Sequence, residues 1–316
     1  MNILNSDILN IDVNQKTINS VIYFHGVGIH SGKAVNMKLI PAQENFGIIF
    51  KRVDLEKDNL IKVDVNNIED SRFCSKLKNN KGVFVSTIEH LLATLHALDI
   101  NNLLIEINSS ELPAMDGSSN EFTNKINEIG IKMQKIPKKI VKIQKTISVR
   151  LGERFIKVDP SASLSFTVKI NYPNTLIGKD KYCYTHNKHN FLNEICYART
   201  FCMSKDVTKL RAYGYGLGGN LNNAIVVDEN KLLNSSGLRC KQEFVKHKVL
   251  DCVGDFYMCG LPIIGKFHAS EPGHELNNKL LKKIFKNKDN FKIVESNSFQ
   301  PYFPMQNNIL TNINVA

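Results

Sequence analysis

The segment EFVKHKVLDCVGD, residues 243–255, places imidazole and carboxylate side chains at a regular spacing. His247, Asp251 and Asp255 follow one another in steps of four, which puts them on one face of an α-helix. Apolar residues fill the other positions, so we expect a mostly buried helix with one polar stripe. A His and an Asp one turn apart can both reach one divalent ion, and a buried hydrogen-bond network is the alternative interpretation.

A second pair of candidate residues, Glu89 and His90, stands at the start of the segment STIEHLLATLHALDI. Its leucines recur at helical spacing and predict a helix whose first turn is exposed. Ser86 and Glu89 have the spacing of a capping box, which is a structural role. An adjacent Glu-His pair also suits a metal hydrolase, in which one residue binds the ion and the other accepts a proton from water.

The surrounding segments predict an α+β fold built from two similar halves. Strands of the first half are expected at residues 21–24, 34–40, 46–52, 61–65 and 103–108. Strands of the second half repeat this order in outline, at residues 140–149, 155–158, 165–170, 224–227 and 263–267. We expect a loose extension at residues 1–15, domain one at 16–136, a KIPKK linker, and domain two at 137–316 with an insert at about 203–228.

The stretch HGVGIHSGK at residues 25–33 is expected to be a hairpin turn. It lacks the third glycine of a dinucleotide-binding loop, and Ala34 follows Lys33 where a phosphate-binding loop has Ser or Thr. His30 in this turn is either structural or faces the functional site.

Composition bounds the class of protein. The chain has 316 residues, 42% of them hydrophobic, enough for two domains. Apolar runs stay well short of the ~20 residues of a membrane span, and the first residues do not form a secretory signal. Seven cysteines without a C-x-x-C pair favour reduced thiols in a cytoplasmic protein, so a metal site must use His and carboxylates.

The net charge of +11 suggests an anionic partner or a compositional bias. Tryptophan is absent, and the densest basic runs, KMQKIPKKIVKIQK and KLLKKIFKNK, lack the interleaved aromatic residues that stack on bases. We therefore expect no nucleic acid as a partner.

Six motifs in order carry a resemblance that covers residues 16–295. They are STIEHL, ELPAMDGSS, ARTF, GLGG with AIVVD, EFVKHKVLDCVGD and GHELNNK. In this order they resemble the zinc deacetylases of lipid A synthesis, the UDP-3-O-acyl-N-acetylglucosamine deacetylases. The resemblance implies two similar α+β layers, each with two helices packed on a sheet, that face each other across the active site, with an insert in each domain. The insert of the second domain forms a channel for an acyl chain in that family, and residues 213–219 and 224–227 are its counterpart here.

The resemblance also implies a metal site. His90, His247 and Asp251 are expected to bind Zn²⁺, leaving the fourth tetrahedral position to water, and Fe²⁺ also suits these ligands. Glu89 is expected to be the general base.

Four further residues receive catalytic roles from the resemblance. Thr200 is expected to hydrogen-bond the oxyanion, and His274 to protonate the leaving amine with Asp255 orienting its ring. Lys248 is expected to supply positive charge near the metal.

Substrate contacts follow in the same way. Phe201, Leu217 and Gly218 are expected to contact the substrate. Arg154 is the candidate partner of the diphosphate, because it stands where the family has a nucleotide-contacting Lys.

The chain departs from the family pattern at three positions. Ile170 falls where a Phe is expected against the uracil, for which Lys241 or Arg239 is the candidate compensation. Pro272 and Glu275 flank His274, and a carboxylate close to an imidazolium raises its pKa.

The sequence therefore predicts a cytoplasmic, monomeric hydrolase without a transmembrane segment. Its expected reaction removes acetate from a UDP-3-O-acyl-N-acetylglucosamine that carries a fatty acyl chain, the committed step of lipid A and lipopolysaccharide synthesis in a Gram-negative bacterium, near the inner membrane. A catalytically inactive homologue that binds the UDP-sugar or a metal is the alternative. A peptidase motif H-E-x-x-H is absent.

Overall fold

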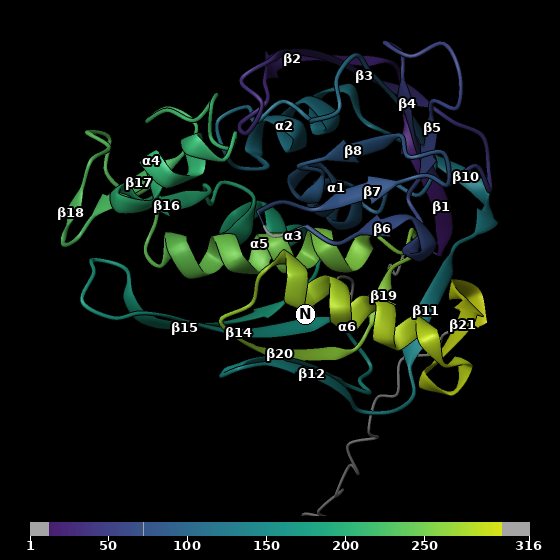
Figure 1. The fold of residues 1–316 in the computed structure, drawn as a ribbon. Helices are drawn as coiled ribbons and strands as arrows, with labels where there is room; N and C mark the ends of the chain where they lie inside the picture. The colour runs from purple at the N-terminus through teal and green to yellow at the C-terminus, as the bar shows by residue number, and fades with distance from the viewer. Residues whose placement is uncertain (1–12, 72, 299–316) are drawn as a thin grey trace, which may run out of the picture.

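Two five-stranded sheets enclose the helices α1, α5 and α6 in the computed structural model, which describes residues 13–71 and 73–298 (Figure 1). The first sheet has the order β2 (Ile22–Val27), β3 (Ala34–Pro41), β9 (Leu103–Ile107), β4 (Ile48–Arg52) and β5 (Leu60–Lys62). The second has the order β12 (Ile147–Leu151), β13 (Arg154–Asp159), β20 (Lys266–Ser270), β14 (Ser165–Tyr172) and β15 (Gly178–Thr185).

The two sheets have the same topology. In each, the first three strands pair antiparallel, the third and fourth pair parallel, and the fourth and fifth pair antiparallel. The helices α1 (Glu89–Ala97) and α2 (Asn120–Ile129) belong to the first half, and α5 (Glu243–Tyr257) and α6 (His274–Lys286) stand at the equivalent places of the second. The α+β class with two similar layers is confirmed.

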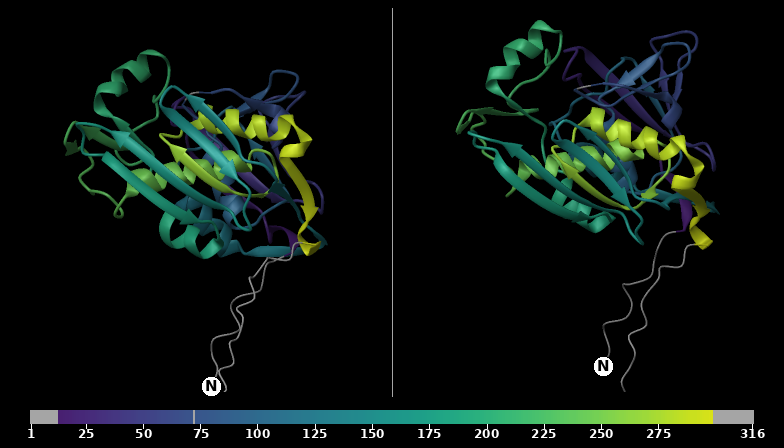
Figure 2. Two further views of the ribbon diagram at one scale, coloured as in Figure 1. Left: turned by 90° about the horizontal axis from the view of Figure 1, so that it is seen from below. Right: turned by 60° about the horizontal axis from the view of Figure 1, so that its bottom comes forward.

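The two inserts occupy equivalent places in the two halves. The first lies between β5 and α1, and the second lies between β15 and α5. The first is a small sheet of β6 (Ile68–Glu69), β7 (Lys76–Lys78) and β8 (Phe84–Ser86), preceded by the 3-10 turn Val65–Asn67. The second holds α3 (Lys188–Asn190), the π-helical turn Phe191–Ile195, α4 (Ser204–Ala212), and the sheet of β16 (Phe201–Met203), β17 (Ile225–Asp228) and β18 (Lys231–Leu232). Figure 2 shows α4 standing out from the body of the molecule.

Two smaller sheets lie where the halves join. One pairs β1 (Asn14–Ile18) with β10 (Ile131–Pro137), and the other has the order β19 (Ile263–Ile264), β11 (Lys139–Ile143) and β21 (Phe291–Glu295). The predicted linker KIPKK is therefore strand on both sides of Lys138. Asn14 and Gln15 of the predicted extension belong to β1, whereas residues 1–12 and the tail after residue 300 lie outside the described residues. The division at residue 136 stays a prediction.

The structure differs from the predicted elements at several places. Residues 140–149 form two strands, because the chain passes from β11 to β12 through residues 144–146. Residues 263–267 are likewise divided between β19 and β20. The helix α4 and the strand β15 were not predicted, since neither has a clear apolar period: α4 has no buried residue, and β15 buries little besides Tyr184.

The central helices are buried on nearly all sides. Every residue of α1 is buried, and α5 leaves only Lys246 and Lys248 partly exposed. A helix that is apolar all round belongs to the core, and the polar groups it carries must find partners there. Among the described residues, the structure contains no helix that is both long and apolar enough to cross a membrane.

The contact between α1 and α5 depends on Gly254. A Cβ at this position would lie 2.0 Å from the carbonyl oxygen of Glu89, a backbone atom that cannot move alone. The absence of a side chain therefore allows α5 to approach the first turn of α1, which carries Glu89 and His90.

We predict that Gly254→Ala destabilises the protein. Alanine normally stabilises a helix interior by about 1 kcal/mol relative to glycine, but here its methyl group must push two helices apart, at a cost of roughly 1–3 kcal/mol. Urea unfolding should therefore give a lower free energy of unfolding for the variant. A gain in stability would contradict the close contact.

A pH-dependent stability follows from His96 at the end of α1. The residue is 7% exposed, and its ring stacks on Tyr257 with centroids 4.6 Å apart. Burial lowers its pKa to about 4, well below the value of about 6.5 expected in the unfolded chain. Between these values the unfolded chain binds more protons, so the free energy of unfolding must fall as the pH falls through this window.

We predict that the titration of His96 alone lowers the free energy of unfolding by about 2 kcal/mol between pH 7 and pH 5. His96→Phe keeps an aromatic ring against Tyr257 and should reduce the loss. His25→Gln is the control substitution, because His25 is exposed on β2. Equal pH dependence of the wild type and His96→Phe in urea unfolding would contradict the assignment.

Candidate metal centre and active site

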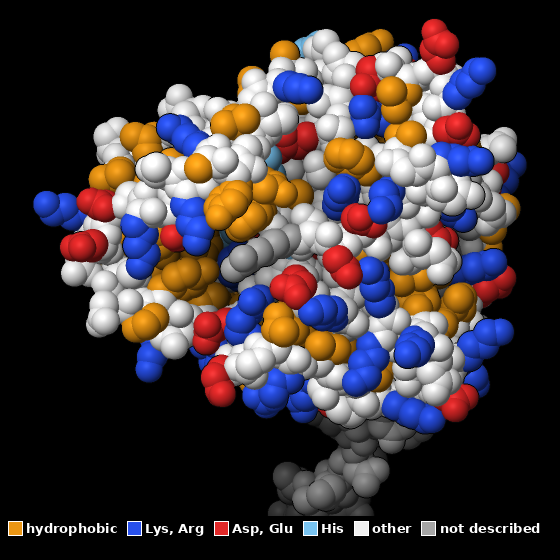
Figure 3. Space-filling model, in the orientation of Figure 1, with side chains coloured by type: hydrophobic (Ala, Val, Ile, Leu, Met, Phe, Trp, Pro, Cys, Tyr) orange, Lys and Arg blue, Asp and Glu red, His pale blue; other side chains and the backbone are white. Residues whose placement is uncertain are grey.

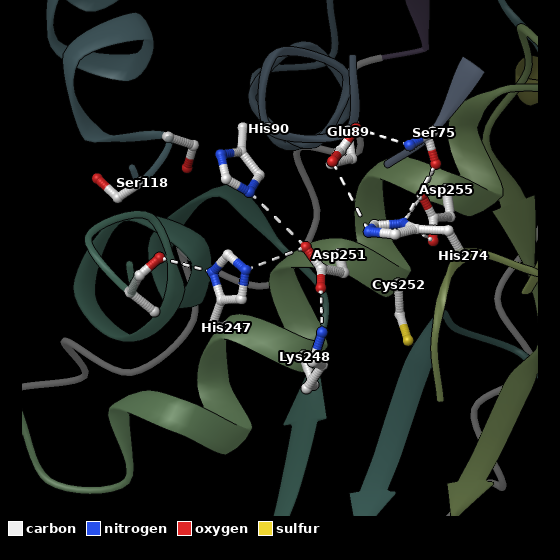
Figure 4. A network of polar contacts seen from close by, with 12 residues as sticks. Ser75, Glu89, His90, Ser118, His247, Lys248, Asp251, Cys252, Asp255 and His274 are labelled. Carbon is white, nitrogen blue, oxygen red and sulfur yellow. Dashed lines mark hydrogen bonds and ion pairs between the residues drawn. The ribbon is translucent and has the colours of Figure 1, made fainter. Parts of the chain in front are cut away.

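His90, His247 and Asp251 meet where α1 crosses α5. The Nε2 atoms of His247 and His90 lie 3.3 and 3.7 Å from Oδ1 of Asp251, and the two rings stand at 89° (Figure 4). Each residue offers one ligand atom, and the three atoms lie within 4.8 Å of one another. The structure thus brings together the three residues that the resemblance placed at the metal.

The contacts of these residues fit a cation better than a hydrogen bond. Nδ1 of His247 lies 3.1 Å from the carbonyl oxygen of Ala198, to which it donates as an N–H group. Its Nε2 lone pair then faces Oδ1 of Asp251, a buried atom with no hydrogen-bond partner among the described residues. Burial lowers the pKa of His247 to about 3, which disfavours a proton between these two acceptors. A divalent ion would satisfy both of them.

Lys248 stabilises the charge of Asp251 from the other side. Its ammonium donates to Oδ2 of Asp251 at 3.0 Å and lies 5.4 Å from the centre of the Phe201 ring. Burial acts to raise the pKa of Asp251, but His247 and Lys248 outweigh it and hold that pKa well below its usual value. Asp251 is therefore an ionised carboxylate with one oxygen left for a metal.

Glu89 and His274 form a second polar pair beside the three ligands. Oε1 of Glu89 lies 3.7 Å from Nε2 of His274, and both side chains are buried. Burial raises the pKa of Glu89, with His274 and His90 opposing the rise. A carboxylate with a raised pKa is a better proton acceptor near neutral pH.

His274 is the first residue of α6 and is oriented by Asp255. Its Nδ1 lies 3.0 and 3.1 Å from the two carboxylate oxygens. Burial acts to lower the pKa of His274, but Asp255 and Glu89 outweigh it and raise this pKa to about 10. The imidazole is consequently protonated at neutral pH and can donate from Nε2. Glu275, the flanking carboxylate, binds Lys279 at 2.7 Å.

Two expectations for the start of α1 were wrong. Glu89 is 4% exposed, so the first turn is buried. The carboxylate does not close a capping box with Ser86: Oε2 of Glu89 accepts the backbone N–H of Ser75 at 3.0 Å, and α1 begins after Ile88 without a side-chain cap. The tertiary contact with Ser75 replaces the local one.

Thr87, just before α1, has a left-handed backbone with φ of 57°. This conformation is unfavourable for a β-branched residue and is held by two hydrogen bonds. Its N–H donates to the carbonyl oxygen of Ser75 at 2.9 Å, and its hydroxyl donates to Glu111 at 3.1 Å. Ser75 and Ala198 contact the site and were not predicted from the sequence. The N–H of Ser75 and the carbonyl oxygen of Ala198 are backbone atoms, and no sequence motif reveals their contacts.

Two adjoining cavities, of about 510 and 630 Å³, lie beside the insert. Both are lined by Phe73, Phe201, Cys202 and Leu210. Thr200 lines the smaller one, as does His30 of the hairpin turn. Figure 3 shows hydrophobic side chains exposed over the insert, at the left, with Lys and Arg side chains among them. A cavity of this kind suits an apolar chain with a polar end.

The other expected substrate contacts lie elsewhere. Leu217 and Gly218 contact the hairpin turn of the first half, through hydrogen bonds from their N–H groups to the carbonyl oxygens of His30 and Ile29, each 3.1 Å long. Nε of Arg154 donates to the carbonyl oxygen of Glu271 at 3.0 Å.

Two arginines near the site have structural partners. Arg199 of the ARTF motif forms a buried ion pair with Glu243 at 2.9 Å, which ties the start of α5 to the insert. Arg239 donates to Asp116 at 2.7 Å, so this candidate compensation for the Phe expected at Ile170 is already paired.

Comparisons with known proteins agree with this geometry. Residues 15–286 match the family model described as UDP-3-O-acyl N-acetylglycosamine deacetylase. A UDP-3-O-acyl-N-acetylglucosamine deacetylase of Haemophilus ducreyi is 42% identical over 287 residues, covering 89% of this chain and 93% of the relative. Proteins of the same name from Actinobacillus pleuropneumoniae and Campylobacter fetus are 40% and 39% identical, each over 89% of this chain and over 93% and 94% of the relative. The chain belongs to the UDP-3-O-acyl N-acetylglycosamine deacetylase family.

Proposed function

We propose that this chain hydrolyses the N-acetyl group of UDP-3-O-acyl-N-acetylglucosamine, giving UDP-3-O-acyl-glucosamine and acetate, the committed step of lipid A biosynthesis. The observation that carries the proposal is the buried Oδ1 of Asp251, which has no hydrogen-bond partner in the described part of the chain. It lies between two imidazole Nε2 atoms, next to a base and an acid. The names of the relatives support the reaction and the substrate.

His90, His247 and Asp251 would hold Zn²⁺, and Fe²⁺ also suits this set. When bound, the ion supplies positive charge that lowers the pKa of the attacking water and polarises the acetyl carbonyl.

The proton transfers are assigned to Glu89 and His274. Glu89 takes a proton from the water as the water oxygen bonds to the acetyl carbon. His274 gives a proton to the nitrogen as the carbon–nitrogen bond breaks. The acid proton that remains on the product passes to the amine, so that the products leave as acetate and an ammonium group. Oε1 of Glu89 and Nε2 of His274 lie 3.7 Å apart, so the proton of Glu89 returns to His274 after the two side chains approach each other or through a water between them. Asp255 keeps Nδ1 of His274 protonated and its Nε2 directed at the site.

The remaining roles concern charge and substrate. Thr200 would donate to the oxyanion, and Lys248 would contribute positive charge beside it. Phe201 at the mouth of the two cavities would contact the acyl chain, with Leu217 and Gly218 fixing the wall of the insert. Arg154 would meet the diphosphate. The cytoplasmic location close to the inner membrane and the monomeric state remain part of the proposal.

We predict that Glu89→Gln lowers kcat for acetate release by about 100-fold or more, because a positioned base contributes about 10²–10⁴. The matched control is Glu106→Gln, since Glu106 pairs with Lys51 on the first sheet. It should retain activity. Turnover of Glu89→Gln near the wild-type rate, at equal zinc content, would reject the base. No acetate from zinc-replete wild type with UDP-sugar binding intact would indicate an inactive homologue.

We predict that the wild type binds one zinc ion per chain and that a chelator abolishes acetate release until zinc is restored. His247→Gln should lose the ion, because it removes one of three protein ligands. His268→Gln is the control, since His268 lies near Asp159 on the second sheet. Elemental analysis together with thermal unfolding at increasing zinc measures the binding. Full zinc content in His247→Gln would exclude this site.

A further inference from the structure

Ser75 lies where the first insert meets both central helices of the site. Its side chain is fully buried, at 0% exposure, immediately before β7. Its backbone N–H donates to Oε2 of Glu89 at 3.0 Å, and its hydroxyl donates to Oδ1 of Asp255. The same hydroxyl oxygen lies 3.3 Å from Nδ1 of His274 (Figure 4). One residue of the first half thus contacts three polar side chains of the proposed reaction.

The chemistry of these contacts fixes the hydrogen positions. An ionised carboxylate only accepts, so the single proton of the Ser75 hydroxyl goes to Asp255. The lone pairs of the same oxygen then face Nδ1 of His274, which must carry a hydrogen to avoid facing two acceptors. Nδ1–H is shared between Asp255 and Ser75, and the Nε2 end of the ring points to Glu89.

The second carboxylate oxygen of Asp255 accepts a hydrogen bond from within the second half, to which Asp255 itself belongs. Nδ2 of Asn277 donates to Oδ2 of Asp255 at 2.8 Å, and Asn277 stands on α6 with His274, three positions further along. Asp255 and His274 therefore have a common support within the second half. Ser75 adds a tie from these two residues to Glu89 in the first half.

The position of Ser75 is set by the backbone. β7 pairs with β8, and the carbonyl oxygen of Ser75 accepts the N–H of Thr87 at 2.9 Å, two residues before Glu89. The ladder continues into the start of α1, so it fixes the position of Ser75 relative to Glu89.

We infer that Ser75 is a positioning residue for the deacetylation: it holds the base Glu89 through its amide and the acid His274 through its hydroxyl, which fixes their distance across the two halves of the fold. This inference rests on the proposed function. The amide contact survives any substitution except proline, whereas the hydroxyl contact does not, so variants of the side chain test the link to His274 alone.

The test compares Ser75→Ala with Ser75→Thr, which keeps a hydroxyl. Ser75→Ala should lower kcat by about 10- to 100-fold, the scale of a misplaced catalytic group, with KM and zinc content little changed. Ser75→Thr should recover most of the loss. The matched control is Ser296→Ala, because Ser296 is 1% exposed and its hydroxyl donates to Val13, away from the site. It should keep its kcat.

Three kinetic outcomes would overturn the inference. The first is a kcat of Ser75→Ala within about twofold of the wild type, well below the loss expected of a misplaced group. The second is equal impairment of the folded Ala and Thr variants, which would mean that the hydroxyl is not the cause. Where Ser75→Ala fails to fold, Ser75→Cys, with its weak S–H donor, takes its place, and a wild-type kcat there is the third outcome.

A spectroscopic measurement separates this inference from the proposed function. Nitrogen NMR of histidine-labelled protein, with His274→Gln to assign the ring, reports which nitrogen of His274 carries hydrogen. The wild type should show a hydrogen-bonded Nδ1–H, weakened in Ser75→Ala and restored in Ser75→Thr. An inactive wild type with this pattern would reject the reaction but keep the positioning role. An unchanged His274 signal in Ser75→Ala would reject the positioning role whatever the activity.

Discussion

The close crossing of α1 and α5 is the constraint on which the site depends. The two helices come from different halves of the chain, and Gly254 lets the backbone of one touch the carbonyl oxygen of Glu89 in the other. At that separation the imidazole of His90 reaches the His247–Asp251 pair, and the carboxylate of Glu89 reaches His274. A larger separation would part His90 from Asp251 and Glu89 from His274, the contacts that join the two halves of the site.

Burial acts on these groups in opposite directions, and their neighbours decide the result. Removal from water raises the pKa of Glu89 and lowers that of His247, which favours a neutral His247 imidazole. His274 is equally enclosed, but Asp255 and Glu89 keep it charged. One dry environment therefore yields a proton acceptor, an uncharged metal ligand and a proton donor within a few side chains of one another. The difference comes from which carboxylates each group faces.

The sequence predicted the parts of this arrangement that repeat along one helix. His247, Asp251 and Asp255 at steps of four are visible in any reading of α5, and the order of six motifs identified the family. Ser86-x-x-Glu89 misled, because a local capping pattern says nothing of the N–H of Ser75 that arrives from another strand. Contacts made by a backbone atom, such as the carbonyl of Ala198, leave no mark on residue type. The polar strand β15 was missed for a similar reason, since its pairing with β14 decides its conformation.

The matching topology of the two sheets allows a comparison between this chain and a symmetric dimer. Two copies of one unit that face each other through their central helices have the arrangement of a symmetric dimer joined into a single polypeptide. Symmetry in a true dimer would force each substitution to appear twice. In a single polypeptide the two copies can differ in sequence. One copy can have a glycine at the crossing, as α5 does at Gly254, without a glycine at the equivalent place of the other. The inserts before α1 and α5 can likewise differ. The asymmetry of the chemistry is thus possible in a single polypeptide, whereas an exactly symmetric dimer would not permit it.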